Sequence, residues 1–333
     1  MPTIEDVARR AGVSRSTVSY ALSGKRSISR QTRERIEAAI TELGFTPNAG
    51  ARALATSQTM VIGLFVQFFE DEFSPAMLQY VLPISDAARE AGYDILMVTE
   101  SDGPHAVQRI ASSGMVDGVM LLNVAYEDGR LPVLRKMRQP GAMVGLPRNP
   151  EDFDVFDLDF PESGRILVDH LAERGHREII LITPHHHVNE RGGAYAWRFR
   201  DAALQQAAHY GIRVRSYFGE TQQPAINQQL NEIMDARDES AMIVHNDAVI
   251  AALPSVLYSR GIRVPDDLSV VGVYSEDFGR LFSLPYTAVE TSPNKLGRIA
   301  VQALVQRMND PLGATAPRVD LVAPHITDRG STR

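Results

Sequence analysis

The segment RSTVSY at residues 15–20 concentrates hydrogen-bonding side chains on one short stretch near the N-terminus. If this stretch is helical, its outward face carries Arg15, Ser16, Ser19 and Tyr20. Arginine can pair bidentately with guanine, serine can donate to or accept from any base, and tyrosine can donate to a base or a phosphate. A short helix with this face is typical of proteins that read base edges in a groove of DNA. The alternative is an ordinary helix face in water.

The charge of the chain is uneven along its length. Residues 1–60 hold nine Lys or Arg and five Asp or Glu, a net charge of +4, so the remainder of a chain with net charge −7 carries −11. A basic segment on an acidic body favours a polyanionic partner for that segment alone. The contacts with the phosphate backbone are expected from Thr17, Lys25, Arg26 and Arg33.

Two further helical patterns position this face. Thr3 and Asp6 have the spacing of a capping box. Apolar residues follow at helical spacing: Ile4, Val7, Ala8 and Ala11. Gly12 permits the left-handed conformation of a tight turn, and Ser14 is a good cap for the next helix. A third helix is predicted over residues 29–44, and three short helices around one core make a helix-turn-helix module.

The predicted helix-turn-helix module sets the expected domain boundaries. We assign residues 1–46 to the helix-turn-helix domain and residues 47–60, PNAGARALATSQTM, to a hinge or linker. Asn48 can cap a helix of about two turns there, which alone in water should be marginal. The simpler interpretation is a plain linker.

Residues 61–333 alternate apolar strand patterns with helical patterns. The strand candidates are 60–66, 93–99, 118–124, 142–147, 178–183, 214–219, 240–246 and 268–273, and helices fit at 85–92, 162–175, 194–211 and 247–261. Continuous apolar strands separated by helices are typical of parallel sheets covered on both faces. We therefore predict an α/β body of two doubly wound lobes whose connecting strands cross more than once.

Ligands in such sheets collect at the carboxyl ends of the strands, so the cleft between two facing lobes is the expected site. The candidates that follow strands are Phe68, Phe69, Phe73, Glu100, Asp102, Asn123, Tyr126, His185–His187, Arg191, Asn246, Asp247, Tyr274, Ser275, Glu276 and Asp277. Aromatic faces together with carboxylate, amide and guanidinium groups suit a sugar-type ligand.

Other chemistry finds little support. The chain contains no cysteine, which excludes disulfides and thiolate sites. No P-loop, G-x-G-x-x-G or G-x-S-x-G motif occurs, so we expect neither a cofactor nor an enzyme. Three adjacent histidines, His185–His187, cannot easily reach one ion together, so we expect a pocket loop and no metal. No apolar signal core or membrane-length run occurs, and a cytoplasmic protein is expected.

The N-terminal sequence TIEDVARRAGVSRSTVSYALSGKRSISRQTRERIEAAITELGFTPNAGARAL resembles that of the LacI/GalR family of bacterial transcription regulators. The resemblance implies that Arg15, Ser16 and Tyr20 determine operator choice, although Tyr20 departs from the Arg or His often found there. It also implies a hinge that folds when two subunits lie side by side on DNA. In that hinge Leu54 wedges between base pairs in the minor groove and Arg52 supports the contact.

The body is similar to the same family in HLAERGHREIILIT, HNDAVIAAL, GIRVPDDLSVVGV and LVAPHITDRGST. The resemblance implies that Asn246 lies at the effector pocket with Asp247 at its edge. An arginine near AWRFRDAAL should bind the effector, with Arg191 and Arg198 both candidates and Tyr195 possible at the usual position. Tyr274 and Ser275 stand where the family typically has an acidic pair.

These observations together predict a ligand-responsive DNA-binding regulator and repressor. The resemblance implies a homodimer on a pseudo-palindromic operator, with a small effector such as a sugar or related metabolite in the inter-lobe cleft. The alternative is a two-lobed solute-binding protein without a DNA role, which the basic N-terminal segment opposes.

Overall fold

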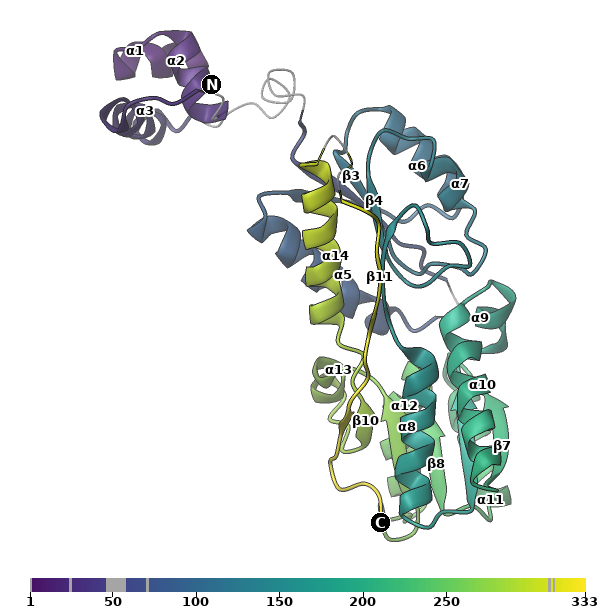
Figure 1. Cartoon of the computed structure of the whole chain (residues 1–333). Coiled ribbons are helices and arrows are strands. Elements are labelled where there is room, and N and C mark those ends of the chain that lie inside the picture. The colour runs from purple at the N-terminus through teal and green to yellow at the C-terminus, as the bar shows by residue number, and fades with distance from the viewer. Residues whose placement is uncertain (1, 24–25, 46–57, 70–71, 311–312, 314) are drawn as a thin grey trace.

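The computed structural model describes residues 2–23, 26–45, 58–69, 72–310, 313 and 315–333. Figure 1 shows three helices at the N-terminal end as a unit separate from two lobes stacked end to end. Three residues named above as DNA contacts, Lys25, Arg52 and Leu54, lie outside the described residues. No described helix is long and apolar enough to cross a membrane.

The described helices are α1 (Ile4–Ala11), α2 (Arg15–Ser23), α3 (Arg30–Leu43), α5 (Ser74–Glu90), α6 (Gly103–Ser112), α7 (Arg130–Leu134), α8 (Phe160–Glu173), α9 (His186–Glu190), α10 (Ala194–His209), α11 (Ala225–Ala236), α12 (Asp247–Ser259), α13 (Glu276–Leu281) and α14 (Pro293–Met308). The described strands are β1 (Val61–Phe65), β2 (Asp94–Val98), β3 (Gly118–Leu121), β4 (Gly141–Val144), β5 (Asp154–Leu158), β6 (Glu178–Thr183), β7 (Arg213–Phe218), β8 (Ala241–Val244), β9 (Ser269–Val273), β10 (Thr287–Val289), β11 (Val319–Val322) and β12 (Ile326–Thr327).

Local signals fix the three N-terminal helices. Thr3 and Asp6 form the predicted capping box at the start of α1, and Gly12 ends that helix with φ 65°. The hydroxyl of Ser14 accepts a hydrogen bond from the backbone N–H of Thr17 at 3.1 Å and so caps α2. One small core joins the three helices through Val7, Ala8, Ala11, Val18, Ile36 and Ala39. The helical interpretation of this segment is confirmed.

In the described part of the body, two six-stranded sheets have the orders β11-β5-β4-β3-β1-β2 (the N-lobe) and β12-β10-β9-β8-β6-β7 (the C-lobe). The chain passes between the lobes after β5, after β10 and after β11, which confirms the expected multiple crossings. All pairings in the N-lobe are parallel. In the C-lobe β7, β6, β8, β9 and β10 also pair in parallel, which confirms the predicted parallel sheets, while the edge strand β12 pairs with β10 antiparallel.

Helices cover both faces of each sheet. In the N-lobe, α5 and α14 contribute to one core and α6 and α7 to the other. In the C-lobe, α8 and α10 cover one face and α11 and α12 the opposite face. Strand β6 illustrates the pattern, because Ile180 and Ile182 enter one core while Ile179 and Leu181 enter the other. This double burial explains the continuous apolar strand sequences.

Strand β5 is buried along its whole length yet is absent from the predicted strands. Its sequence DVFDL carries two aspartates that interrupt the apolar run. Asp154 accepts a hydrogen bond from Arg307 of α14 at 2.6 Å, and Asp157 accepts one from the backbone N–H of Leu146 at 3.0 Å. Asp157 also accepts a hydrogen bond from the backbone N–H of Leu158 at 2.9 Å, but the partners outside β5 cannot be inferred from the sequence of the strand.

Candidate functional site

Helix α2 presents the predicted base-reading side chains to solvent. Arg15, Ser16 and Tyr20 are exposed and Ser19 is half-buried, whereas Val18 is fully buried beneath them. The hydroxyl of Ser14 bonds with the hydroxyl groups of Ser16 and Thr17 at 2.8 Å each. The first turn of α2 is thus held in place by its own cap while its outer face stays open.

Tyr20 has a cationic neighbour. The guanidinium carbon of Arg26 lies 5.7 Å from the centroid of the Tyr20 ring, and both side chains are exposed. A cation over an aromatic face at this distance is a favourable contact. Arg26 therefore lies beside the face formed by Arg15, Ser16 and Tyr20, where it can reach a phosphate.

A cavity of about 170 Å³ lies between the two lobes; we call it the cleft cavity. Its aromatic walls are Phe68, Phe73, Tyr80, Phe160 and Tyr195. Its polar walls include Glu72, Gln79, Asn123, Asp157, His245, Asp247, Ser275 and Thr291. The lining comes from both lobes at the carboxyl edges of their sheets, as expected for a doubly wound architecture.

Six predicted residues line the cleft cavity: Phe68, Phe73, Asn123, Tyr195, Asp247 and Ser275. Asn246 instead lines a smaller adjoining cavity, the side cavity, and its side chain caps α12 by accepting from the backbone N–H of Val249 at 3.0 Å. Several other candidates lie outside both linings: Phe69, Glu100, Asp102, Tyr126, Glu276 and Asp277.

Tyr274 does not line the cleft cavity, where the sequence predicted it. Its side chain is 1% exposed and packs in the core of the C-lobe, where its hydroxyl donates to the backbone carbonyl of Tyr286. Successive residues after a strand alternate in direction, so Ser275 faces the cavity while Tyr274 turns into the core. The hydroxyl of Ser275 donates to the amide oxygen of Gln79 in the opposite lobe.

The two candidate arginines both bridge the lobes and neither lines the cleft cavity, so effector binding by Arg191 or Arg198 stays a prediction. Arg191 donates to the Glu72 carboxylate at 3.0 Å, and its guanidinium carbon lies 4.0 Å from the Phe69 ring centroid. Arg198 donates to the backbone carbonyl of Leu146 at 3.0 Å. We call these two contacts the inter-lobe clasp.

The sequence did not predict several residues that line the cleft cavity: Glu72, Gln79, Tyr80, Asp157, Phe160, His245 and Thr291. His245 directly follows β8 and Phe160 closely follows β5, so the strand-end rule could have found both once β5 was recognised. Tyr80 and Gln79 lie within α5, and only the packing of that helix between the lobes brings them to the cavity.

The pKa values of three titratable groups that line the cleft cavity are shifted. Burial raises the pKa of Asp157 to about 7 and that of Asp247 to about 7. Burial also lowers the pKa of His245 to about 3, which keeps its imidazole neutral between the rings of Phe160 and Phe199. Near pH 7 the two carboxyl groups are therefore partly protonated, and a protonated carboxyl or a neutral imidazole can both donate and accept hydrogen bonds, which suits a ligand with several hydroxyl groups.

Replacing Asp157 with asparagine is expected to raise the free energy of unfolding more at pH 8 than at pH 5. The pKa of Asp157 rises from 3.8 to about 7 on folding. Between pH 3.8 and about 7 the folded chain therefore binds a proton that the unfolded chain releases. The contribution of Asp157 to the free energy of unfolding is lost as pH rises through this range. His245 acts in the opposite direction, but equally in both proteins. Urea unfolding at both pH values measures the difference between variant and wild type, and a difference independent of pH contradicts the prediction.

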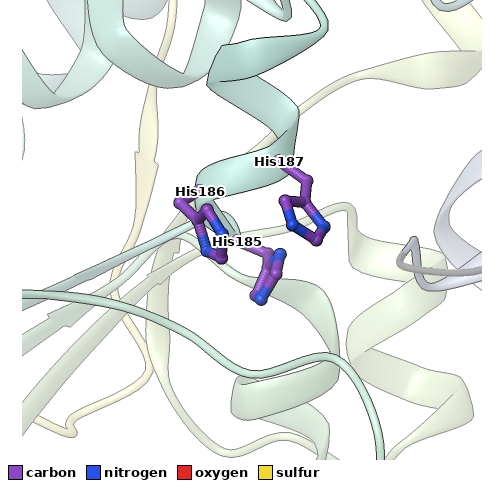
Figure 2. Close-up of side chains that lie close together, drawn as sticks. All are labelled: His185, His186 and His187. Atoms are coloured by element: carbon purple, nitrogen blue, oxygen red, sulfur yellow. The ribbon is translucent and has the colours of Figure 1, made fainter.

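The three adjacent histidines form a group at the start of α9, shown in Figure 2. One ring nitrogen from each lies within 4.8 Å of the others. The ring nitrogens therefore lie close together, and the expectation that the three histidines do not bind one ion stays a prediction. His185 precedes the helix with a non-helical backbone, ψ 147°, and this turns its side chain toward those of His186 and His187.

Two family models match this chain. The model of "Bacterial regulatory proteins, lacI family" matches residues 3–48, and the model of "Periplasmic binding protein-like domain" matches residues 168–332. The HTH-type transcriptional regulator CelR of Thermobifida fusca is 31% identical over 331 residues, covering 96% of this chain and 95% of CelR. The HTH-type transcriptional repressor PurR of Photobacterium profundum is 28% identical over 322 residues, covering 93% of each.

A solved complex of the transcriptional regulator CelR with cellobiose is similar to this structure with a TM-score of 0.67 and 27% identity, covering 99% of this chain and 100% of that one. The match over residues 3–48 overturns the alternative of a solute-binding protein without a DNA role. The chain therefore belongs to the LacI family of bacterial regulatory proteins, and it is a ligand-responsive, DNA-binding transcriptional regulator rather than an enzyme.

Proposed function

We propose that this regulator acts as a homodimer on a pseudo-palindromic operator. Two identical heads related by one symmetry axis match two half-sites of DNA. Residues 1–46 would bind DNA, residues 47–60 would form the hinge, and residues 61–333 would bind the effector and form the dimer. Arg52 and Leu54 would make the minor-groove contacts of that hinge, where an apolar wedge can unstack a base step.

The base-reading surface of this proposal is the exposed face of α2. Arg15, Ser16, Ser19 and Tyr20 contact base edges, while Thr17, Lys25 and Arg26 contact the sugar-phosphate backbone. The position of the Arg26 guanidinium over the Tyr20 ring supports this division, because it places a cation at the border of the face. Tyr20 is then held by a neighbour and makes a directed contact.

Replacing Arg15 with alanine is expected to weaken operator binding by about 1–3 kcal/mol, roughly 10- to 100-fold, and random-sequence DNA much less. The matched control is Arg30→Ala, which removes the same charge from a side chain that is 94% exposed on α3. Fluorescence anisotropy with an operator selected from random DNA gives both affinities. Equal losses on operator and random DNA would show that Arg15 contacts only phosphates.

The effector we propose is a neutral carbohydrate, and the walls of the cleft cavity carry this proposal. Its described lining combines aromatic rings with carboxyl, amide and hydroxyl groups and contains neither arginine nor lysine. Hydroxyl groups find partners there, whereas a carboxylate or phosphate finds no cation. Cellobiose in the solved CelR complex supports the same class.

A thermal-shift screen tests the effector class. Cellobiose and other neutral mono- and disaccharides are compared with the matching sugar phosphates, with unfolding temperature as the readout. We expect neutral sugars alone to raise that temperature, because a ligand that binds only the folded state stabilises it. A rise with the phosphates alone would overturn the proposed class while leaving the DNA proposal intact.

The inter-lobe clasp links the effector to lobe position. Glu72 lines the cleft cavity and also accepts hydrogen bonds from Arg191 of the C-lobe and Asn123 of the N-lobe, at 3.0 and 2.8 Å. An effector that hydrogen bonds to Glu72 therefore competes with Arg191 or reorients it. Effector and operator affinity are then reciprocally coupled through the relative position of the lobes.

A further inference from the structure

The cluster of His185, His186 and His187 is not used by the proposed function. The ring centroids lie 4.2 Å apart for His185–His186, 4.6 Å for His185–His187 and 4.2 Å for His186–His187. Figure 2 shows the three rings gathered on one side of the start of α9. Imidazole is a preferred ligand of zinc, copper and nickel ions, so a cluster of this kind has a definite chemistry.

The spacing of the nitrogens suits one metal ion. The three ligand nitrogens lie within 4.8 Å of one another. Nitrogens bound to one zinc ion at 2.0–2.1 Å in tetrahedral geometry stand roughly 3.4 Å apart. Rotations about the side-chain bonds close this difference, and the backbone of α9 can stay in place.

Glu190 is a candidate fourth ligand on the same helix. The carboxylate oxygens of Glu190 lie 3.9 Å from Nε2 of His186 and 4.0 Å from Nε2 of His187. Glu190 follows these residues by four and three positions, so its side chain projects from the same side of the helix. We propose that His185, His186, His187 and Glu190 bind a divalent first-row transition-metal ion, with zinc as the best match to a tetrahedral set of three nitrogens and one oxygen.

The site is accessible from solvent and adjoins the cleft. The side chains of His186 and His187 are each 47% exposed, and that of Glu190 is 65% exposed. His185 lines the side cavity together with Asp247. A metal bound there would hold the start of α9, whose C-cap is Arg191 of the inter-lobe clasp.

Zinc titration of the metal-stripped full-length protein tests the proposal. Isothermal titration calorimetry is expected to give one zinc ion per chain, and His186→Ala and His187→Ala are each expected to weaken binding at least about 10-fold. The matched control is His209→Ala, an exposed histidine on α10, which should leave the affinity unchanged. Cobalt substitution should give the visible absorption of a tetrahedral site in the wild type and lose it in His187→Ala.

Melting curves of each variant confirm that the fold is retained. Failure of the wild type to bind zinc, or an equal loss in His209→Ala, would overturn the metal site. Operator binding by the metal-stripped protein is measured in parallel, because the proposed DNA contacts do not involve α9. Failure of the metal site therefore leaves the proposed function testable by itself.

Discussion

Replacing Arg130 with methionine is expected to lower the free energy of unfolding by about 3–5 kcal/mol, because it leaves a buried carboxylate without its counter-charge. Arg130 is 2% exposed and pairs with Asp128, whose side chain is 5% exposed, at 2.7 Å. Burial by itself raises the pKa of Asp128, but the hydrogen bonds and charge of Arg130 outweigh it and hold that pKa below 3.8. Urea unfolding followed by circular dichroism measures the loss.

The matched control for this prediction is Arg89→Met, whose partner Asp86 lies on the surface. The side chains of Arg89 and Asp86 are 72% and 65% exposed, so we expect little or no change in the free energy of unfolding. Adding Asp128→Asn to Arg130→Met should recover part of the lost stability, since it removes the uncompensated charge. Equal losses for Arg130→Met and Arg89→Met would contradict the role of burial.

Arg130 also shapes the cleft cavity. Its guanidinium donates to the backbone carbonyls of Leu122 and Asn123 at 3.1 and 3.0 Å, where the chain leaves β3. Asn123 has a positive φ of 50°, an uncommon conformation for a residue other than glycine. Arg130→Met should therefore weaken effector binding as well as stability, even though Arg130 does not line the cavity.

The second large effect is expected at Asp247. Asp247→Ala should weaken binding of the effector about 10- to 100-fold, the usual loss when a hydrogen bond to a carboxyl group is removed. Asp247 lines both the cleft cavity and the side cavity. Binding of the best sugar from the thermal-shift screen, measured by calorimetry, gives the loss directly.

The stability of Asp247→Ala at pH 8 should increase, whereas its affinity for the effector should fall. Burial raises the pKa of Asp247 from 3.8 to about 7, so at pH 8 the folded protein contains a buried charge that costs stability. The unfolding temperature of Asp247→Ala at pH 8 should therefore exceed that of the wild type. Asp247→Asn is the matched control, because it keeps a hydrogen-bonding side chain without the charge. A variant that loses both stability and affinity would contradict an effector-binding role for Asp247.

An alanine substitution at Asn246 would not test effector binding alone, because Asn246 also has a structural role in α12. Its side chain caps α12, and loss of a cap costs about 0.5–2 kcal/mol. An alanine there changes the helix as well as the side cavity, whereas Asn246→Asp retains the cap. The resemblance identified the position, and the tertiary structure shows that its first contact is with its own helix.

The sequence by itself determined the three-helix head and the alternation of the body. The capping box at Thr3 and Asp6, the turn at Gly12 and the exposed face of α2 depend on contacts three or four residues apart, which a sequence displays directly. The apolar strands can likewise be predicted from the sequence, because a strand that is buried on both faces needs continuous apolar residues. Strand β5 was not predicted because two aspartates interrupt its apolar run, and the short strands β10, β11 and β12 were not predicted either.

Only the tertiary structure decided which side chains meet in the cleft. Arg191 and Arg198 stand at plausible positions in the sequence, yet the approach of the two lobes directs them to Glu72 and to the Leu146 carbonyl. Tyr274 turns into a core that forms only when distant segments pack. The histidine cluster likewise depends on the backbone angle at His185. Spacing in a sequence defines which residues share an element, but the directions and distances between elements are set by packing across the whole fold.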